Sequence, residues 1–393
     1  MPERRRIVVV TPRGPIPFGN ADSRWYYVLL RGLVERGYDV TGLSACRSTA
    51  EAELTQQYFP RGEYDVRTFV YPHRTGPWSR FQSWLRPHSY MFSQEFHATL
   101  EAELRRGFSV LHLEQLCAGW LGFKYAHSSL LNIHNLTSID LTNAKEADKS
   151  LLPEWRLAKR AETAILPRYP YIRTLTKRLE QAVRQSATTA KVSTVPIGID
   201  TTLYRYIPEH ERTAEPVITL IGSMDWYPSV SAAKRLISRL WPRIKEKVPA
   251  AQLRIIGWHA KSCLKEFVGT PDVTVLENVE STTDYFRQTG VFVYAPECGT
   301  GMKVKILEAM AYGVPIVTTS EGVEGFPEEV KDILETADDD AGIVNRAVEM
   351  LVNREKQNTS RAVGRQLVEQ YCSPRPTLDG IEELYQPLFR RRS

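Results

Sequence analysis

The sequence predicts an α/β fold of two doubly wound, Rossmann-like domains that face a central cleft, each with a parallel sheet covered by helices on both faces. Short apolar runs rich in β-branched residues alternate with helical patterns, and this alternation occurs in two series separated by a polar stretch at residues 208–216. With 393 residues, the chain has room for two domains of ordinary size. We therefore predict an N-terminal domain over residues 1–208, a C-terminal domain over 209–372, and a helix over 373–393 that packs back towards the N-terminal domain.

The first series opens with the apolar run Ile7–Val10 and a loop rich in Pro and Gly. A helical pattern then extends from Trp25 to Val34 and is closed by Gly37. A strand follows, and because parallel strands need a crossover helix, the pattern predicts a βαβ unit. The strands expected in this half are Ile7–Val10, Tyr38–Leu43, Val110–Leu113, Ser129–Ile133 and Arg173–Thr176.

The second series repeats the alternation of strands and helices after residue 216. The expected strands are Val217–Gly222, Leu253–Gly257, Val273–Leu276, Val291–Ala295 and Ile316–Thr319, and the expected helices are Ser231–Val248, Thr282–Gln288 and Lys303–Tyr312. Ligands of open α/β sheets bind at the carboxyl ends of strands. We therefore expect the chemistry in the loops that follow Val10, Ile133, Leu220, Ile256 and Ala295.

Composition and charge exclude several classes of protein. A formal net charge of +5 is too dilute to indicate nucleic acid as a partner, although it is compatible with anionic substrates or a weak hold on a membrane surface. No apolar run reaches the ~18 residues of a membrane span. The five scattered cysteines indicate reduced thiols in a cytoplasmic protein, which leaves the inner face of the membrane open as its location. No metal-binding motif is present, so we expect no metal, and the first loop lacks the G-x-G-x-x-G of a dinucleotide site.

The most informative segment is residues 296–315, which follows a predicted strand and opens a predicted helix. Gly299 and Gly301 in its turn would let a ligand approach the backbone, and the free N–H groups of a helix start favour an anion. Lys303 adds a positive charge where the helix dipole alone disfavours it. The local pattern fits a diphosphate site and a solvated surface lysine about equally.

Glu308 lies in the same predicted helix, which is apolar on most sides. A carboxylate in such surroundings is rarely left without a partner. It can accept hydrogen bonds from the vicinal hydroxyls of a ribose, or it can pair with Lys305 one turn earlier. Taken alone, the pattern favours the ion pair.

These segments together resemble those of GT-B glycosyltransferases. The stretch Gly299–Thr319 (GTGMKVKILEAMAYGVPIVTT) closely resembles the donor-site signature of that fold, particularly in the retaining glycosyltransferase family 4, also described as glycosyl transferases group 1. Weaker likenesses cover most of the chain: they are Leu220–Val230, Pro196–Asp200, Leu253–Gly257, Val291–Pro296 and Phe18–Arg24 with Leu30–Val40.

The resemblance implies a role for each matched residue. Glu308 would hold the ribose hydroxyls of a nucleotide sugar, and His134 would point at the transferring sugar, although a histidine in such a loop is also an ordinary hydrogen-bonding residue. We expect His134, Lys303 and Glu308 to form the catalytic set. The donor would contact Gly222, Ser223, Gly257, Val279, Gly299, Thr300, Gly301, Met302, Lys303 and Glu308, and the acceptor would contact Gly19, Asn20 and Arg24.

Two features depart from the family pattern. Thr300 stands where the first glutamate of the family's E-x7-E motif would fall, which changes how sugar hydroxyls are held. The usual Arg and Lys pair after the Gly222 strand is replaced by Met224, Asp225 and Trp226. Lys303 is then the candidate for the phosphate charge, with Lys305 as the alternative.

The function expected from the resemblance is retaining transfer of a sugar from a nucleotide diphosphate sugar to a hydroxyl acceptor, without any cofactor. The acceptor could be a glycan, a lipid-linked glycan or a natural product. The alternatives are a non-catalytic protein of the same fold that binds nucleotide sugars, and a nucleotide-sugar epimerase. The sequence does not indicate an oligomeric state.

Aromatic and basic residues interleave at residues 71–92 and again at 155–173. Such segments can rest on an anionic membrane surface or line an acceptor groove. Packing onto the core of the domain is the simpler interpretation, and we favour it.

Overall fold

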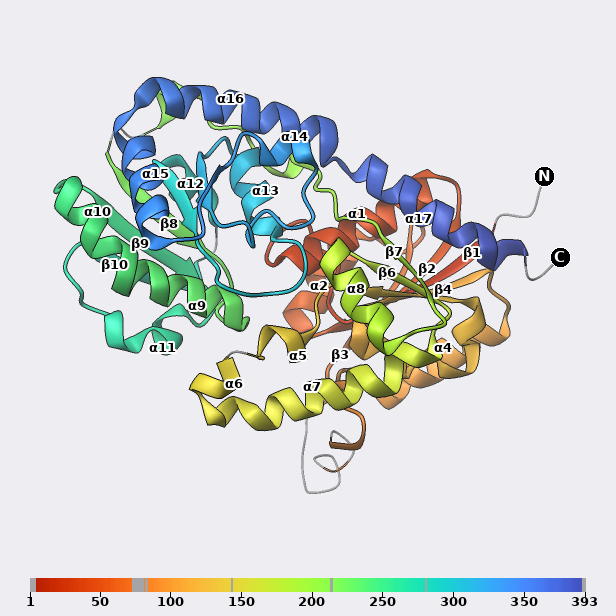
Figure 1. The fold of residues 1–393 in the computed structure, drawn as a ribbon. Coiled ribbons are helices and arrows are strands. Elements are labelled where there is room, and N and C mark those ends of the chain that lie inside the picture. The colour runs from red at the N-terminus through yellow and green to blue at the C-terminus, as the bar shows by residue number, and fades with distance from the viewer. Residues whose placement is uncertain are drawn as a thin grey trace. The chain divides into compact units, whose positions relative to one another are not determined.

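The computed structural model describes residues 5–390 apart from 73–80, 82–83, 143, 213–214 and 280. The chain divides into two compact units (Figure 1). Unit 1 comprises Met1–Gly198 and Pro374–Ser393, and unit 2 comprises Ile199–Ser373.

Unit 1 contains a seven-stranded sheet in the order β3-β2-β1-β4-β5-β6-β7, and every pairing in it is parallel. Its strands are β1 (Arg6–Thr11), β2 (Asp39–Cys46), β3 (Asp65–Val70), β4 (Val110–Glu114), β5 (Ser129–Ile133), β6 (Tyr171–Thr174) and β7 (Lys191–Thr194). The central strands β4 and β5 are buried along their whole length, and β1 along all but its first residue, as expected for a parallel sheet with both faces covered.

The helices of unit 1 are α1 (Ala21–Glu35), α2 (Thr49–Tyr58), α4 (Gln94–Arg105), α5 (Thr137–Asp140), α6 (Ala144–Ala147), α7 (Leu152–Ile165), α8 (Lys177–Ser186) and α17 (Pro374–Phe389). The crossover helix α1 begins where the side chain of Asn20 accepts a hydrogen bond from the Ser23 N–H. It ends before Gly37, whose φ of +85° suits glycine at a helix terminus.

Unit 2 contains a six-stranded parallel sheet in the order β10-β9-β8-β11-β12-β13. Its strands are β8 (Val217–Ile221), β9 (Gln252–Gly257), β10 (Val273–Glu277), β11 (Val291–Tyr294), β12 (Ile316–Thr318) and β13 (Glu335–Thr336). Its helices are α9 (Tyr227–Arg235), α10 (Trp241–Lys247), α11 (Ala260–Cys263), α12 (Thr283–Arg287), α13 (Val304–Ala311), α14 (Glu328–Lys331), α15 (Asp340–Val352) and α16 (Arg354–Tyr371).

The two parallel sheets confirm the predicted α/β class. The helix expected at 231–248 is interrupted by a π-helical turn at Leu236–Leu240, between α9 and α10, and Pro242 follows at the start of α10. That the two domains face a common cleft stays a prediction.

The segment 199–208 belongs to unit 2, whereas the sequence placed the domain boundary after residue 208. The Ile199 N–H donates to the Cys372 carbonyl at 2.7 Å. The first and last segments of unit 2 are therefore hydrogen-bonded to each other. The Arg365 guanidinium donates to the carbonyls of Thr201, Tyr204 and Ala311 and so fastens the segment to α13 and α16.

The C-terminal helix α17 belongs to unit 1, where it lies beside α1 (Figure 1). The contact is close, because a Cβ added at Gly32 of α1 would fall 2.4 Å from a methyl group of Leu378. Arg36 at the end of α1 forms ion pairs with Asp379 and Glu382.

Candidate functional site

In unit 2, the carboxyl ends of β8 and β9 meet through two glycines. The Gly222 N–H donates to the Ile256 carbonyl at 2.9 Å. A Cβ at Gly257 would lie 1.8 Å from the Gly222 carbonyl oxygen, which no side chain can do. Glycine at position 257 is therefore required for the close approach of the two strand ends, at the edge where α/β sheets bind ligands.

The loop from β11 to α13 forms the second wall of this site. Gly299 and Gly301 have φ angles of +137° and +82°, which side chains rarely adopt. A Cβ at Gly299 would also lie 2.9 Å from the ring of Pro228 in α9. The turn that contains Gly299 and Gly301, called the glycine turn below, thus packs against the start of α9, beside the end of β8.

The ammonium of Lys303 lies beneath this turn and is buried, with 1% of the residue exposed. Its Nζ donates to the carbonyls of Gly299 at 3.0 Å and Gly301 at 2.8 Å. It also lies 3.3 Å from a carboxylate oxygen of Glu321 and 3.7 Å from one of Glu324. Lys303 therefore closes the glycine turn and balances two carboxylates.

Lys305 points to the opposite side of the turn, towards the end of β8. Its Nζ donates to the Ser229 hydroxyl at 2.6 Å and lies 4.3 Å and 4.9 Å from the ring centroids of Tyr294 and Trp226. A Cβ at Gly222 would come within 3.0 Å of this Nζ. Burial, together with the charge of Lys303, lowers the pKa of Lys305 to about 7, and Glu308 opposes this shift only in part.

Glu308 lies on the half-buried side of α13, whose other side is packed into the core. Its Oε1 accepts a hydrogen bond from the Tyr204 hydroxyl at 3.1 Å. The Tyr204 ring in turn packs edge-on against Tyr312. The ion pair between Glu308 and Lys305 that the sequence favoured is absent among the described residues, where Lys305 contacts Ser229 and two aromatic rings instead.

The remaining residues expected to contact the donor are arranged around the same edge. Thr300 and Met302 are buried within the glycine turn. The Ser223 hydroxyl accepts from the Asp225 N–H at 3.3 Å and so shapes the loop after β8. Val279 is half-buried in the loop after β10, which is separated from β8 by β9.

In unit 1, His134 follows the end of β5 and lies between two carboxylates. Its Nε2 is 2.6 Å from Glu114 Oε2 and its Nδ1 is 3.3 Å from Asp22 Oδ1. Burial opposes the charged form, but the attraction of Glu114 and the hydrogen bonds to both carboxylates raise the pKa of His134 to about 9. Burial opposes the charged form of both acids as well, but contacts with His134, and for Glu114 also with His112, lower the pKa values of Asp22 and Glu114. The three residues thus form a charged cluster at neutral pH.

This cluster continues into the core as a chain of buried polar contacts. Glu114 Oε1 lies 2.8 Å from His112 Nε2 and accepts from the Trp25 indole N–H at 3.2 Å. Burial lowers the pKa of His112, so this imidazole is neutral where His134 is charged. The other ring nitrogen of His112 meets the Tyr385 hydroxyl of α17 at 2.5 Å.

The residues expected to bind the acceptor lie at the start of α1, close in sequence to Asp22. Gly19 has a φ of +84°. The side chain of Asn20 caps α1 through the Ser23 N–H at 2.9 Å, so this oxygen is occupied within the fold. Arg24 is half-buried in the first turn of the helix.

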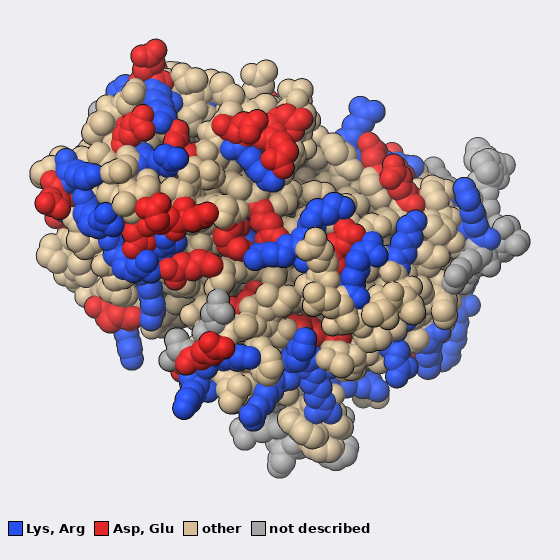
Figure 2. Space-filling view, in the orientation of Figure 1, with Lys and Arg blue, Asp and Glu red and all other residues tan. Residues whose placement is uncertain are grey.

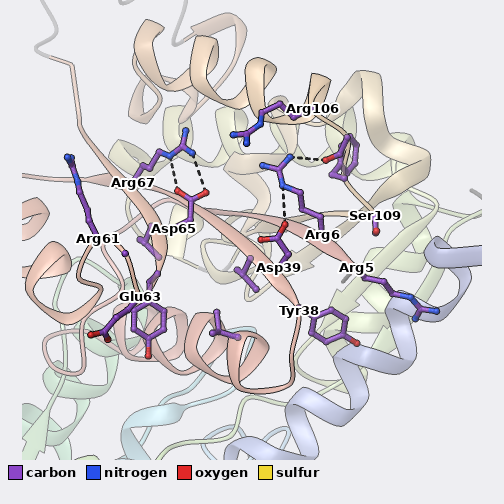
Figure 3. Close-up of a pocket in the computed structure, with 17 residues that line it drawn as sticks. Arg5, Arg6, Tyr38, Asp39, Arg61, Glu63, Asp65, Arg67, Arg106 and Ser109 are labelled. Atoms are coloured by element: carbon purple, nitrogen blue, oxygen red, sulfur yellow. Dashed lines mark hydrogen bonds and ion pairs between the residues drawn. The ribbon is translucent and has the colours of Figure 1, made fainter. Parts of the chain in front are cut away.

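A cavity of about 1280 Å³ lies at the other edge of the unit 1 sheet, next to the amino ends of its strands (Figure 3). Three of its arginines are paired with neighbouring acids: Arg6, Arg67 and Arg106 all bind Glu103, and Arg67 also binds Asp65. Arg5 lies over the ring of Phe389. This cavity lies at the opposite end of the strands from His134, and most of its arginines are engaged within the fold.

Basic side chains gather along α7 on the face shown in Figure 2. Arg156, Lys159 and Arg160 of this helix are exposed, whereas the Trp155 indole donates to the Ser138 carbonyl at 2.8 Å. The aromatic residue therefore packs onto the domain and the cations face outward. Much of the other aromatic segment, including Trp78 and Arg80, lies outside the described residues.

The described part of the chain has no group of three or more His, Cys, Asp or Glu side chains placed to hold a metal ion. Nor does any helix in it combine the length and apolarity needed to cross a membrane.

Residues 215–353 match the family model of glycosyl transferases group 1. This confirms the resemblance seen in the sequence, and the matched region includes the glycine turn, both lysines and Glu308. No curated protein sequence gives a significant match to the chain.

Solved structures share the fold over nearly the whole chain. Sucrose-phosphate synthase from Thermosynechococcus elongatus has a TM-score of 0.73 at 17% identity, covering 99% of this chain and 100% of its own. Anabaena Alr3699/HepE, in complex with UDP and glucose, has 0.64 at 12%, covering 96% and 98%. The E. coli trehalose-6-phosphate structure bound with UDP-2-fluoro glucose has 0.67 at 13%, covering 97% and 99%. The fold is therefore GT-B, with two α/β domains.

Several residues around these sites were missed by the sequence analysis. Asp22 and Glu114 flank His134, and Tyr204 holds Glu308. A carboxylate at the end of the apolar run Val110–Glu114 was a usable signal, because it falls at the carboxyl end of a predicted strand. Nothing in the sequence pairs Tyr204 with a residue so distant along the chain.

Proposed function

We propose that this chain is a retaining glycosyltransferase that moves a sugar from a nucleotide diphosphate sugar to a hydroxyl acceptor. The observation that carries the proposal is the glycine turn leading into α13, with Glu308 further along that helix, inside the region that matches glycosyl transferases group 1. Two proteins of similar fold are bound to UDP with glucose or to UDP-2-fluoro glucose, which supports a nucleotide sugar as donor.

In this proposal the donor lies along the carboxyl edge of the unit 2 sheet. Glu308 accepts hydrogen bonds from the ribose hydroxyls, and Tyr204 orients its carboxylate. Backbone N–H groups of the glycine turn and of the loop at Gly222 and Ser223 bind the diphosphate. Such fixed donors stabilise charge that develops on the leaving group without having to reorganise.

The transfer needs no side-chain base. The bond from the anomeric carbon to the diphosphate oxygen breaks, a bond from that carbon to the acceptor oxygen forms, and the acceptor proton passes to an oxygen of the leaving diphosphate. His134 contributes a fixed positive charge in unit 1 rather than a base, because both its ring nitrogens face carboxylates. The acceptor is a glycan, a lipid-linked glycan or a natural product that offers a hydroxyl group.

Donor binding is tested first. A thermal-shift screen of nucleotide sugars should raise the unfolding temperature with one donor, because a ligand that binds the native state stabilises it. Proton NMR of the first product, formed with an acceptor or with water, should then show the anomeric configuration of the donor. Inversion of that configuration would overturn the retaining assignment.

The ribose assignment is tested with Glu308→Gln. Loss of the carboxylate should weaken nucleoside diphosphate binding by about 10- to 100-fold, the range for hydrogen bonds to charged groups. Glu329→Gln, an exposed change in α14, is the matched control and should bind as the wild type does. Unchanged affinity in a folded Glu308→Gln variant would remove Glu308 from the site.

One observation favours a second candidate. Thr300, buried in the turn, takes the place of an acidic residue in the family pattern, so the chain could bind a nucleotide sugar without transferring it. Calorimetry that shows binding, with no transfer or hydrolysis across a panel of acceptors, would support this non-catalytic role. An epimerase would instead convert the bound donor into a second nucleotide sugar, which NMR detects.

A further inference from the structure

Lys305 is a lysine whose ammonium lies at the carboxyl edge of a sheet and forms no ion pair with a carboxylate of the described residues. The ammonium meets the Ser229 hydroxyl, the two aromatic rings and the backbone of Gly222. Among the residues that the structure describes, that hydroxyl is its only hydrogen-bond partner. An ammonium has three donors, so this environment leaves hydrogen-bonding capacity for an anion.

Lys303 has a contrasting environment, although it is only two residues away. Two carbonyl oxygens and two carboxylates surround its ammonium. Lys303 is the non-helical N-cap residue of α13, whereas Lys305 lies in the first turn of that helix, so the two side chains leave the backbone in different directions. The charge of Lys303 is thus balanced within the protein.

The position of Lys305 also explains why residue 222 is glycine. A side chain there would begin 3.0 Å from the ammonium and 3.4 Å from the Ser229 hydroxyl. Without one, the ammonium can share the space over the end of β8 with a ligand bound to the loop backbone. The aromatic rings shield the ammonium from water on the sides and attract it through cation–π interactions.

We propose that Lys305 is the cation that receives the diphosphate of the donor, and that Lys303 serves to hold the glycine turn in shape. This inference rests on the proposed function, since it names the group that binds the phosphates of the nucleotide sugar. The loop after β8 carries Met224, Asp225 and Trp226, none of which is basic. The positive charge for the diphosphate therefore comes from α13 in this chain.

A proton should be taken up when the diphosphate binds. With a pKa of about 7, Lys305 is partly neutral in the free protein near pH 7.5, and a bound anion favours its charged form. The charged groups that face it are Lys303, which lowers this pKa, and Glu308, which raises it; the side chains contributed by α9 and β11 are uncharged. Diphosphate affinity should therefore fall as the pH rises from about 7 to about 9.

The test begins with the nucleoside diphosphate, among ADP, GDP, UDP, CDP and dTDP, that most stabilises the wild-type chain. Its affinity and that of the matching nucleoside are measured by calorimetry for the wild type and for Lys305→Met. Methionine keeps an unbranched side chain between the two rings. The variant should lose about tenfold or more in diphosphate affinity, the effect of one charge-assisted hydrogen bond, and bind the nucleoside unchanged.

Lys247→Met is the matched control, because this exposed lysine of α10 hydrogen-bonds to Asn345 and not to the site. It should bind both ligands as the wild type does. Calorimetry near pH 7.5, in two buffers of different ionisation enthalpy, should show that the wild type takes up protons when the diphosphate binds. Lys305→Met should lack the part of this uptake that the lysine supplies.

The outcomes separate this inference from the function on which it rests. Equal losses for diphosphate and nucleoside, or no loss at all, would overturn the role of Lys305 while leaving the donor site standing. If the wild type binds no nucleoside diphosphate, the proposed function fails. Inorganic pyrophosphate then tests the lysine alone: binding by the wild type that Lys305→Met loses supports the anion site, and absence of wild-type binding overturns it.

Discussion

At the scale of single residues, the environment of a charged group determines what it can do. His134 illustrates this, because the carboxylates of Asp22 and Glu114 use both of its ring nitrogens. An imidazolium held in this way cannot accept a proton. It makes a fixed electrostatic contribution, and its charge persists well above the pH at which an ordinary histidine becomes neutral.

We expect the ring of His134 to titrate near pH 9, against a usual value of 6.5. NMR of the full chain with labelled histidine measures this directly, and Asp22→Asn should lower the midpoint. Because the folded-state pKa is raised, the stabilising effect of the cluster is complete below about pH 6.5 and is lost as the pH rises through about 9. A wild-type midpoint near 6.5 would show that the two carboxylates do not hold the charge.

Lys303 is expected to affect stability more than ligand binding. Replacement with methionine leaves two carbonyls and the carboxylates of Glu321 and Glu324 without their common cation, and breaking a buried ion pair costs about 3–5 kcal/mol. Urea unfolding should show a marked loss in the free energy of unfolding for Lys303→Met and little change for the exposed Lys247→Met. Unchanged unfolding combined with weaker diphosphate binding would instead place Lys303 on the phosphate.

At the scale of elements, the site depends on how closely strand ends approach one another. The end of β9 packs onto the end of β8 only because residue 257 has no Cβ, and Gly222 then presents its backbone to Lys305. The glycine turn packs against the start of α9 for the same reason. The site is therefore assembled by backbone contacts, with few side chains involved.

Gly257→Ala should destabilise the chain by about 1–3 kcal/mol, as overpacking does, and also weaken nucleoside diphosphate binding. Gly364→Ala in α16 is the matched control: its Cβ would meet only side chains at 3.6 Å, and alanine favours a helix by about 1 kcal/mol. Thermal unfolding should thus move in opposite directions for the two variants. A Gly257→Ala chain as stable as the wild type would show that the strand ends can separate without cost.

The sequence predicted the interior of both sheets but not all of their edges. The missed strands β3, β7 and β13 are all edge strands, which are short or polar because only one side is paired. The glycine turn and Glu308 were found because their pattern is local. The distinction between Lys303 and Lys305 was not, since it depends on which face of α13 meets β8, and the partners of His134 come from separate elements.

At the scale of the whole molecule, unit 1 is built from both ends of the chain. It includes α17, whose side chains Leu378, Ile381 and Leu384 are buried and whose Tyr385 contacts His112. Val195, just after β7, packs against Gly380. The core of unit 1 is therefore completed only by residues synthesised after the whole of unit 2.

A chain that ends at Ser373 should consequently fold poorly in unit 1. Each large apolar side chain of α17 contributes about 1.5–3 kcal/mol by its burial, and α1 would expose the surface around Gly32 that Leu378 covers. We expect this truncated chain to unfold at a lower temperature and to be cleaved within residues 5–198 by a protease that spares the full chain. A chain ending at Arg390, which keeps all of α17, is the control and should behave as the wild type does. Equal protease resistance of the two truncated chains would mean that residues 5–198 form a stable core without the C-terminal helix.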